Sequence, residues 1–296
     1  MNDQHSTSKA AFWMTGWLSA MVVMAVAGRE AVREVAIFQV MELRSVIGFF
    51  LLYPLIRSNG GFAAMRTARP WQHAMRNVFH YGAQFGWFVA LTLIPLAQLV
   101  AIEFTMPIWT ALLAVFFLGE RVNAWKSLAV VLGLVGVAII VRPAAGEVNA
   151  GQMIALAAAV GFAVSVIMVK SLTRSDSVVV ILFWMLVVQS VVGFVPALLV
   201  WRWPSATAWC WIFVIACCGT FSHYCMARAM LHADATVVVP MDFLRVPLTA
   251  AAGWAIYSER VDALTVLGAA LILVGNLLNL RTVRGARVRA APISPP

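Results

Sequence analysis

Residues 90–122 read ALTLIPLAQLVAIEFTMPIWTALLAVFFLGERV, and residues 229–261 read AMLHADATVVVPMDFLRVPLTAAAGWAIYSERV. The two stretches align without a gap at an offset of 139 residues (259 minus 120). Matches between charged residues carry the argument, because apolar residues coincide by composition in an apolar chain. The chain therefore contains an internal repeat. The most telling matches place Glu120-Arg121-Val122 on Glu259-Arg260-Val261, Glu103 on Asp242, and Phe104 on Phe243.

The composition is that of a membrane protein. Of the 296 residues, 62% are hydrophobic and only 11% are charged, and the mean hydropathy is +0.90. Soluble domains have about half apolar and about a quarter charged residues. The net charge of +9 does not indicate a nucleic-acid partner, because the basic residues lie in short gaps between apolar runs. The four cysteines share one apolar run without a Cys-x-x-Cys pair, so we expect buried thiols and no metal site.

Ten apolar runs approach the length of about 20 residues that a membrane-spanning helix needs. The polar loop 143–150 divides them into two sets of five. We therefore expect an all-α integral membrane protein with a first repeat at 12–142, a second at 151–281 and a basic tail at 282–296. Trp13 and Trp17 in a long first run favour a retained span over a signal peptide. The expected helices are 12–28, 35–56, 77–94, 96–118, 124–141, 151–170, 178–200, 208–227, 235–257 and 261–280.

The basic residues predict the orientation, because cytoplasmic loops are rich in Lys and Arg. With the N-terminus inside, fourteen basic residues lie on the cytoplasmic side and five on the other, and both termini are cytoplasmic. Each half holds an odd number of spans, so the two copies point in opposite directions. Inverted repeats of this kind are typical of secondary transporters. The five on the outer side are Arg29, Arg33, Arg142, Arg202 and Arg260.

Several short features recur along the chain or stand out in its spans: Pro95-Leu96-Ala97, Phe104 with Pro107, Leu118-Gly119-Glu120-Arg121, Gly133-x-x-Gly136, Arg142-Pro143, and Arg44 in the second span. In these features the chain resembles the ten-helix EamA family of the drug/metabolite transporter superfamily. The resemblance covers about residues 12 to 281, with two EamA-like units. The second copy departs from the pattern, with Asp234-Ala235-Thr236 where the first has Pro95-Leu96-Ala97.

The resemblance implies secondary active transport of a small polar metabolite across the inner membrane by alternating access. An amino-acid derivative or vitamin-like cargo is expected, with export slightly favoured. Uptake of a vitamin or nucleoside-like compound such as riboflavin or S-adenosylmethionine is the alternative, and a channel or structural membrane partner is the rival of another class. The sequence contains no enzyme motif and no ATP-binding loop. We therefore expect neither enzyme activity nor a cofactor. The partners expected are the cargo, membrane lipid and protons, with a monomer and a homodimer both open.

Five ionisable residues lie inside expected spans, where a charge costs about 2.5–3.5 kcal/mol on insertion scales. These five residues have two possible roles: they form ion pairs that stabilise the helix bundle, or they bind the substrate or a proton. Asp242 and Arg245 are three residues apart on one helical face and can pair. Glu103 has no basic residue within a turn of its own helix, so we predict that it is the acid that couples transport or binds cargo. The five are Glu42, Arg44, Glu103, Asp242 and Arg245.

Further residues complete the expected cavity. Thr110 and Thr249 lie on the same helical stripes as Glu103 and Asp242. Pro107, Pro240 and Pro247 interrupt their helices, either as binding-site breaks or as packing kinks. Glu120-Arg121 and Glu259-Arg260 read as anchors at helix ends rather than cargo contacts. A second set of side chains that would line the cavity comprises His80, Trp87, His223 and Tyr224.

Overall fold

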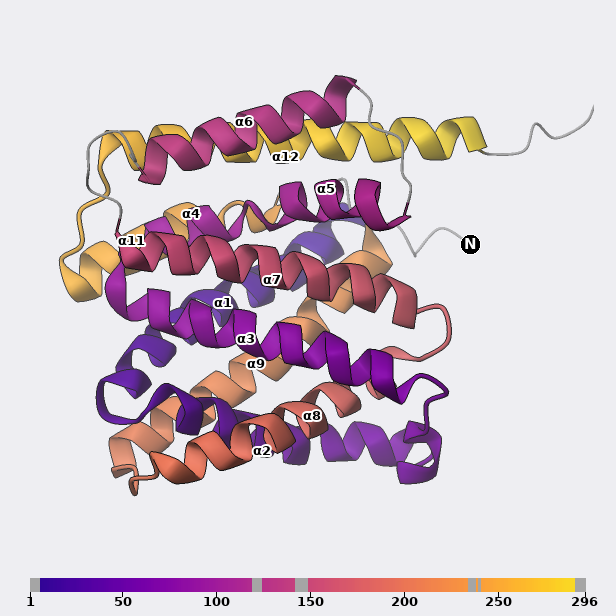
Figure 1. Ribbon diagram of the computed structural model, residues 1–296, viewed down its shortest axis with the longest axis vertical. Helices are drawn as coiled ribbons and strands as arrows, with labels where there is room; N and C mark the ends of the chain where they lie inside the picture. Colours follow the sequence, from indigo (N-terminus) through magenta and orange to yellow (C-terminus); the bar gives the residue numbers. More distant parts are fainter. Residues whose placement is uncertain (1–5, 119–123, 142–148, 234–237, 239–240, 291–296) are drawn as a thin grey trace, which may run out of the picture.

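The computed structural model describes residues 6–118, 124–141, 149–233, 238 and 241–290, and this part of the chain is almost entirely helical (Figure 1). Regular structure there consists of α-helices and one short 3-10 helix, which confirms the expected all-α class. The elements are α1 (Thr7–Glu34), α2 (Ile37–Ser58), η1 (Phe62–Met65), α3 (Pro70–Leu93), α4 (Leu96–Glu103), α5 (Met106–Leu118), α6 (Ala124–Val141), α7 (Ala150–Leu172), α8 (Val178–Leu199), α9 (Ala206–His232), α11 (Arg245–Tyr257) and α12 (Ala263–Ala290).

Several helices begin at polar residues that the sequence places just before an apolar run. The hydroxyl of Ser177 accepts a hydrogen bond from the backbone N–H of Val180, and Ser205 does the same for Ala208. Asn149 and Gln152 form a capping box at the start of α7. These side chains satisfy N–H groups that have no partner in the first helical turn, so they fix where each helix starts.

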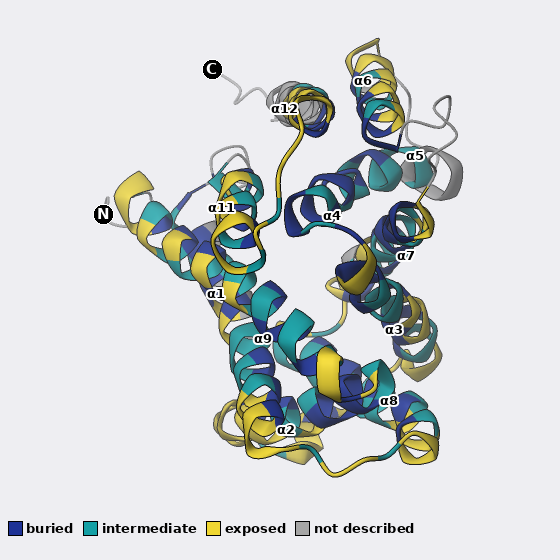
Figure 2. Cartoon of the chain, turned by 90° about the vertical axis from the view of Figure 1, so that its left-hand side faces the viewer, coloured by how far each residue is buried: buried dark blue, intermediate teal, exposed yellow. Residues whose placement is uncertain are grey.

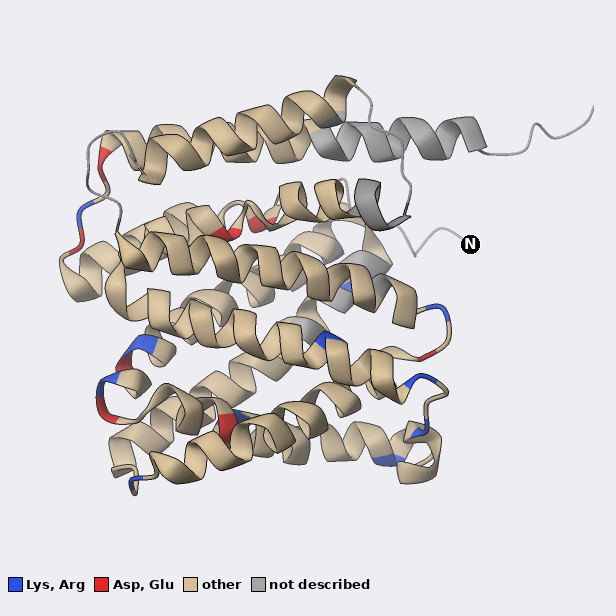
Figure 3. Cartoon of the chain, viewed as in Figure 1, with Lys and Arg blue, Asp and Glu red and all other residues tan. Residues whose placement is uncertain are grey.

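Within the described residues, six helical segments are long and apolar enough to cross a membrane. They are Thr7–Glu34, Ile37–Ser58, Leu96–Leu113, Ala150–Val169, Val178–Leu199 and Ala206–Met226. Two shorter apolar helices accompany them, at Ser127–Val141 and Ala263–Leu278. In the described part of the chain, Lys, Arg, Asp and Glu gather mainly at the two ends of the helix bundle (Figure 3). The protein is therefore a multi-pass membrane protein.

Residues 96–118 were expected to form one helix, and that expectation is wrong. α4 ends at Glu103, Phe104 and Thr105 form a turn, and α5 begins at Met106. Pro107 has no N–H and its ring clashes with the preceding turn, so the ladder of hydrogen bonds stops. The second copy has its turn at Phe243 and Leu244, the matching positions, with Pro247 just inside α11. Pro240 lies outside the described residues.

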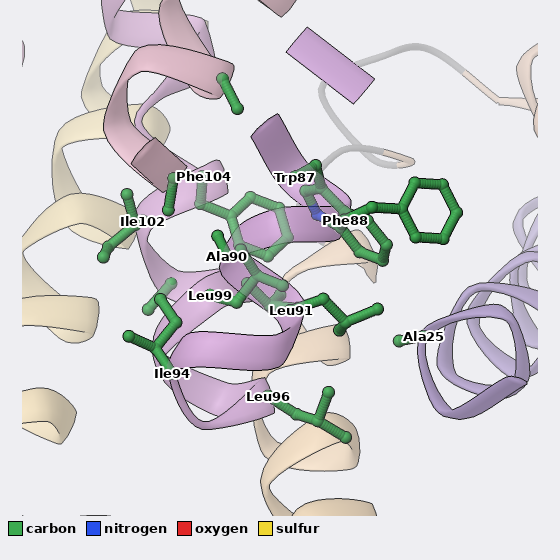
Figure 4. Close-up of a cluster of buried hydrophobic side chains, with 14 of the residues drawn as sticks. Ala25, Trp87, Phe88, Ala90, Leu91, Ile94, Leu96, Leu99, Ile102 and Phe104 are labelled. Carbon is green, nitrogen blue, oxygen red and sulfur yellow. The ribbon is translucent and has the colours of Figure 1, made fainter. Parts of the chain in front are cut away.

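The helices pack in pairs whose members are far apart in the sequence: α1 with α9, α3 with α7, α2 with α8, and α6 with α12. α4 lies at the centre of the described core, with most of its side chains buried (Figures 2 and 4). The pair α6 and α12 lies along one edge of the bundle (Figure 1). A Cβ on Gly136 would come within 2.6 Å of the Gly268 carbonyl oxygen, so small residues allow these two backbones to meet.

Candidate functional site

The two helix breaks bring three charged side chains together. The Arg245 guanidinium, at the start of α11, donates to Glu103 at 2.8 Å and to Asp242 at 3.4 Å. Glu103 is the last residue of α4, so the first of these bonds joins the two copies of the repeat. The side chains of Arg245, Glu103 and Asp242 are 6%, 16% and 13% exposed, which places the ion pairs inside the bundle.

Aromatic rings surround these charges. The indole N–H of Trp87 on α3 donates to Glu103 at 2.9 Å, and that of Trp17 on α1 donates to Asp242 at 2.6 Å. Each carboxylate therefore receives one bond from arginine and one from tryptophan. The Arg245 guanidinium lies 4.8 Å from the centre of the Phe104 ring, within reach of a cation–π contact. We call Glu103, Asp242, Arg245, Trp17 and Trp87 the central cluster.

The break in the first copy is held by a residue from α12. The carbonyl oxygen of Phe104 is free of the helical ladder, because the N–H of Ile108 bonds the Thr105 carbonyl instead. The side-chain amide of Asn276 donates to the Phe104 carbonyl at 2.8 Å. Phe104 also meets Phe243, its counterpart in the repeat, edge to face at 5.3 Å. The turn that carries Glu103 is thus fixed by contacts from the second copy.

The prediction that Glu103 lacks a cation is wrong. Arg245 supplies one from the other copy, a contact that distance along the chain does not reveal. The predicted pairing of Asp242 with Arg245 is present. The continuous stripe through Glu103 and Thr110 is also wrong, because the helix breaks between them. The Thr110 hydroxyl donates to the Met106 carbonyl at 2.9 Å, and that of Thr249 donates to the Arg245 carbonyl at 2.8 Å.

Glu42 and Arg44 lie on α2, which contributes no residue to the central cluster. With the Gln84 amide oriented so that its oxygen faces α2, that oxygen accepts from the Arg44 guanidinium, 3.1 Å from Nη2. Glu42 is 6% exposed, and its Oε2 has no hydrogen-bond partner among the described residues. The structure therefore divides the five predicted ionisable residues into two groups.

The second predicted set divides as well. Trp87 belongs to the central cluster. His80 lies between α3 and α7, with its ring 5.3 Å from that of Phe162 and its Nδ1 3.4 Å from the Ser165 hydroxyl. Tyr224 is 51% exposed, and its ring packs edge to face on that of Trp13 on α1. The His223 side chain lies outside the described residues.

A cavity of about 1030 Å³ opens at the end of the bundle where α1 ends and α4 begins. Arg29 and Glu259 form an ion pair in its wall, and Glu259 also accepts from the backbone N–H of Leu96 at 2.9 Å. The Glu259 side chain is only 15% exposed, and its contacts join the end of α1 to the start of α4. The ion pair with Arg29 makes that burial possible. Glu120 and Arg121 lie outside the described residues.

Four residues that make contacts in these two regions escaped the sequence reasoning: Trp17, Arg29, Asn276 and Tyr257. Tyr257 donates from its hydroxyl to Glu30 at 2.8 Å and stacks under Arg29 at 4.8 Å. A tryptophan in an apolar run is equally typical of the membrane interface, so Trp17 carried no distinguishing signal. Asn276 is one of two amides, with Asn279, in an otherwise apolar expected span, and that signal was available.

Comparisons with known proteins agree with this architecture. The sequence profile of the EamA-like transporter family matches residues 8–142 and again 149–281. The S-adenosylmethionine uptake transporter of Rickettsia prowazekii is 28% identical over 240 residues, which are 81% of each chain. The riboflavin transporter of Rhizobium johnstonii is 32% identical, over 79% of this chain and 78% of its own.

An exporter is also similar. The pseudopaline exporter of Pseudomonas aeruginosa is 29% identical, over 87% of this chain and 90% of its own. A crystal structure with 21% identity covers 95% of this chain and 99% of its own with a TM-score of 0.64, a likeness that bears on the fold alone. The family profile matches nearly the whole chain in two copies, and the relatives all carry small metabolites. This protein belongs to the EamA-like transporter family and is a membrane transporter of small metabolites.

Proposed function

We propose that this protein is a secondary active transporter of a small, positively charged metabolite with a planar ring. The cargo binds at the central cluster, between two inverted repeats of five spans each. The observation that carries the proposal is the bridge from Arg245 of one repeat to Glu103 of the other, at paired helix breaks. Broken helices at the interface of two repeats are where many secondary transporters hold their cargo.

The packing of the helices supports the two-repeat arrangement. At the offset of 139 residues, α1 corresponds to α7 and α9 to α3, so the pair α1–α9 corresponds to the pair α7–α3. The same offset matches α2 with α8 and α6 with α12, so in each of these pairs a helix packs against its own counterpart. The close approach of Gly275 to Ala129 becomes that of Gly136 to Gly268. A two-fold relation between the copies predicts this exchange of contacts.

The distribution of charge supports an inner-membrane location with both termini cytoplasmic. In that orientation the large cavity faces outward, and the Arg29–Glu259 pair joins the repeats beside it. On the cytoplasmic side, His73 Nε2 of α3 lies 2.8 Å from Asp176 Oδ2 in the turn before α8. Alternating access would require these two contacts to open in turn.

The charge of the central cluster supports a cationic cargo. Two carboxylates face one guanidinium, which leaves a surplus of negative charge when all three are ionised. A cationic group on the cargo would compete with Arg245 for Glu103 and so weaken the bridge between the repeats. Binding of cargo would then favour the rearrangement that transport requires, because a ligand shifts a conformational equilibrium through its different affinities for the two states.

The aromatic rings support a planar group on the cargo. Phe104 and Phe243 lie against the cluster, and the Trp17 and Trp87 rings reach it through their N–H groups. S-Adenosylmethionine, the cargo named for the Rickettsia relative, combines a purine ring with ammonium and sulfonium charges. Riboflavin has a planar ring but no cationic group. The cluster therefore favours the first type of compound.

The test is exchange of labelled compounds across proteoliposomes that contain the purified protein. We expect labelled S-adenosylmethionine to show saturable counterflow and riboflavin to show weak exchange. Export and uptake are measured by loading label on either side. The Glu103→Gln, Asp242→Asn double variant should lose exchange, while Gly82→Ala is a control because a Cβ there meets nothing within 4 Å. Flux without saturation would indicate a channel, and riboflavin exchange without S-adenosylmethionine exchange would contradict the cationic cargo.

Reporter fusions test the arrangement of the spans. A reporter fused after Arg281 should behave as cytoplasmic, and one inserted within residues 143–150 should behave as external. These two results together require an odd number of spans between the positions. A cytoplasmic reporter at 143–150 would contradict the inverted repeat.

A further inference from the structure

A second buried polar group lies outside the central cluster, where α2, α3 and α8 meet. Glu42 on α2 is 6% exposed, Tyr81 on α3 is 5% exposed and Gln189 on α8 is fully buried. Within the described part of the chain, Glu42 Oε2, the Tyr81 hydroxyl and Gln189 Nε2 have no hydrogen-bond partner. Three unpartnered polar atoms on neighbouring helices are unusual, since most buried polar atoms in proteins are bonded.

Gly193 on α8 shows how close these groups lie. A Cβ there would come 2.7 Å from Glu42 Oε2 and 2.8 Å from the Tyr81 oxygen, so both atoms occupy the space above this glycine. Gln189 precedes Gly193 by one helical turn and therefore lies on the same side of α8. The three polar groups thus converge on one small region between the helices.

Few charges surround this region. On α2, Arg44 is the nearest cation in the sequence, and its guanidinium is engaged with Gln84 of α3. The sequences of α8 and η1 contain no titratable residue. Towards Arg44, α9 presents Ala216, Gly219 and Thr220, and its titratable groups at this level are the thiols of Cys217 and Cys218. Among the described residues, no cation lies within ion-pair distance of Glu42.

The energetics distinguish Glu42 from the other buried acids. An ionised carboxylate buried without a cation or donors is strongly unfavourable, whereas a protonated carboxyl can donate its O–H to a tyrosine oxygen. The Tyr81 O–H and the Gln189 N–H are the donors that the ionised form would need, and neither is engaged elsewhere. Glu103 and Asp242, by contrast, are each bonded to Arg245 and to a tryptophan.

We propose that Glu42 is the proton-binding site of this transporter, separate from the cargo site and supported by Tyr81 and Gln189. In the arrangement of this structure, Glu42 holds a proton taken from water. When α2 moves relative to α8, the carboxyl releases that proton to water on the opposite side of the membrane, and the carboxylate accepts hydrogen bonds from Tyr81 and Gln189. This proposal rests on the proposed transport function. The residue that matches Glu42 in the second copy is Ile181, so the repeat does not duplicate this site.

Infrared spectroscopy tests the site without any cargo. The purified protein in lipid is compared at acidic and alkaline pH, and the carboxyl C=O bands are assigned by exchange into D₂O. We expect a protonated-carboxyl band that Glu42→Gln removes and Glu103→Gln retains. Tyr81→Phe should shift this band, because it removes the hydroxyl beside the carboxyl. A spectrum that is unchanged in Glu42→Gln overturns the proposal.

Transport gives the second measurement, with labelled S-adenosylmethionine as the probe. A proton gradient should drive its accumulation by the unsubstituted protein. Glu42→Gln should lower that accumulation by about tenfold or more, a range typical of coupled binding equilibria, while exchange at equal pH persists. Accumulation by Glu42→Gln at the level of the unsubstituted protein overturns the proposal. If the unsubstituted protein does not exchange the probe, the proposed cargo is wrong, and the infrared result alone decides on Glu42.

Discussion

The break after α4 and the break before α11 occupy matching places in the two copies, but different groups stabilise them. Both have an acid just before a phenylalanine, Glu103 before Phe104 and Asp242 before Phe243, and a proline shortly after. Only the second copy has a cation there, because Arg245 matches Met106. Only the first has its free carbonyl bonded by an amide from α12, because Asn276 matches Val137.

This difference separates what a repeat duplicates from what it does not. Both copies have an acid and, four or five residues later, a proline, and the two turns lie against each other through Phe104 and Phe243. Arg245 and Asn276 are found only in the second copy and contact the first. Trp17 is found only in the first copy and donates to Asp242 of the second, so each copy supplies different groups to the contact. An asymmetric site can bind an asymmetric cargo, which two identical halves would not favour.

The largest expected effect comes from Arg245→Met, which makes the second break like the first. Both Glu103 and Asp242 would lose their cation inside the bundle, and we expect a loss of stability of about 3–5 kcal/mol. Thermal unfolding of the purified variant, followed by tryptophan fluorescence, measures it. Adding Glu103→Gln and Asp242→Asn should restore much of the loss. A melting temperature equal to that of the unsubstituted protein would show that the ion pairs contribute nothing.

Comparing Glu103→Gln with Asp242→Asn shows which of the two acids contributes more to the stability of the fold. Glu103 has the shorter bond to Arg245, 2.8 Å against 3.4 Å. We expect Glu103→Gln to cost about 1.5–3 kcal/mol, the range for a hydrogen bond to a charged group, and Asp242→Asn to cost less. The same unfolding assay measures both. If Asp242→Asn cost more than Glu103→Gln, the Arg245–Glu103 pair between the copies would be weaker than the Arg245–Asp242 pair within the second copy.

The amide on α12 should have an intermediate effect. Asn276→Val installs the residue that the first copy has at the matching position, and it leaves the Phe104 carbonyl without its donor. We expect a cost of about 1–3 kcal/mol, as for an unsatisfied buried group. Hydrogen exchange should also become faster at the backbone amides that follow the break. Protection there at the original level would show that the turn does not depend on α12.

The smallest effects are expected at the two threonines. Each hydroxyl donates to a carbonyl of its own helix, so Thr110→Val and Thr249→Val should each cost less than about 1 kcal/mol. Thr249→Val should be the more costly of the two, because Thr249 is fully buried. Cargo affinity is measured alongside stability. A large loss of affinity in Thr110→Val would restore the original expectation that this hydroxyl contacts cargo.

The sequence predicted the all-α membrane class and the family for physical reasons. Apolar runs of membrane length have few alternatives to helix in lipid, because each backbone polar group must be bonded within the segment. The repeat was visible because its acids and arginines stand out in apolar surroundings. The prolines lie close to the breaks, although the sequence reading favoured a fixed packing kink over a break.

The candidate site was predicted only in part. Glu103, Asp242 and Arg245 were chosen as ionisable residues that are costly in a membrane and Trp87 as a residue lining the cavity, and the structure brings the four together. Glu42 was chosen for the same reason and lies elsewhere. The interpretation of Glu103 as the uncompensated acid failed because it considered only neighbours along one helix.

By itself, the sequence determined which segments are helical and which residues carry charge, because these depend on local chemistry and on the lipid surroundings. Only the tertiary structure decided which charges meet. Arg245 reaches Glu103 across 142 residues of chain, while Glu42 and Arg44, two residues apart, do not pair: Arg44 bonds Gln84, and Glu42 Oε2 has no partner among the described residues. The physical reason is that an ion pair needs a distance of a few ångströms. In a bundle of helices that distance is set by packing between segments remote in sequence.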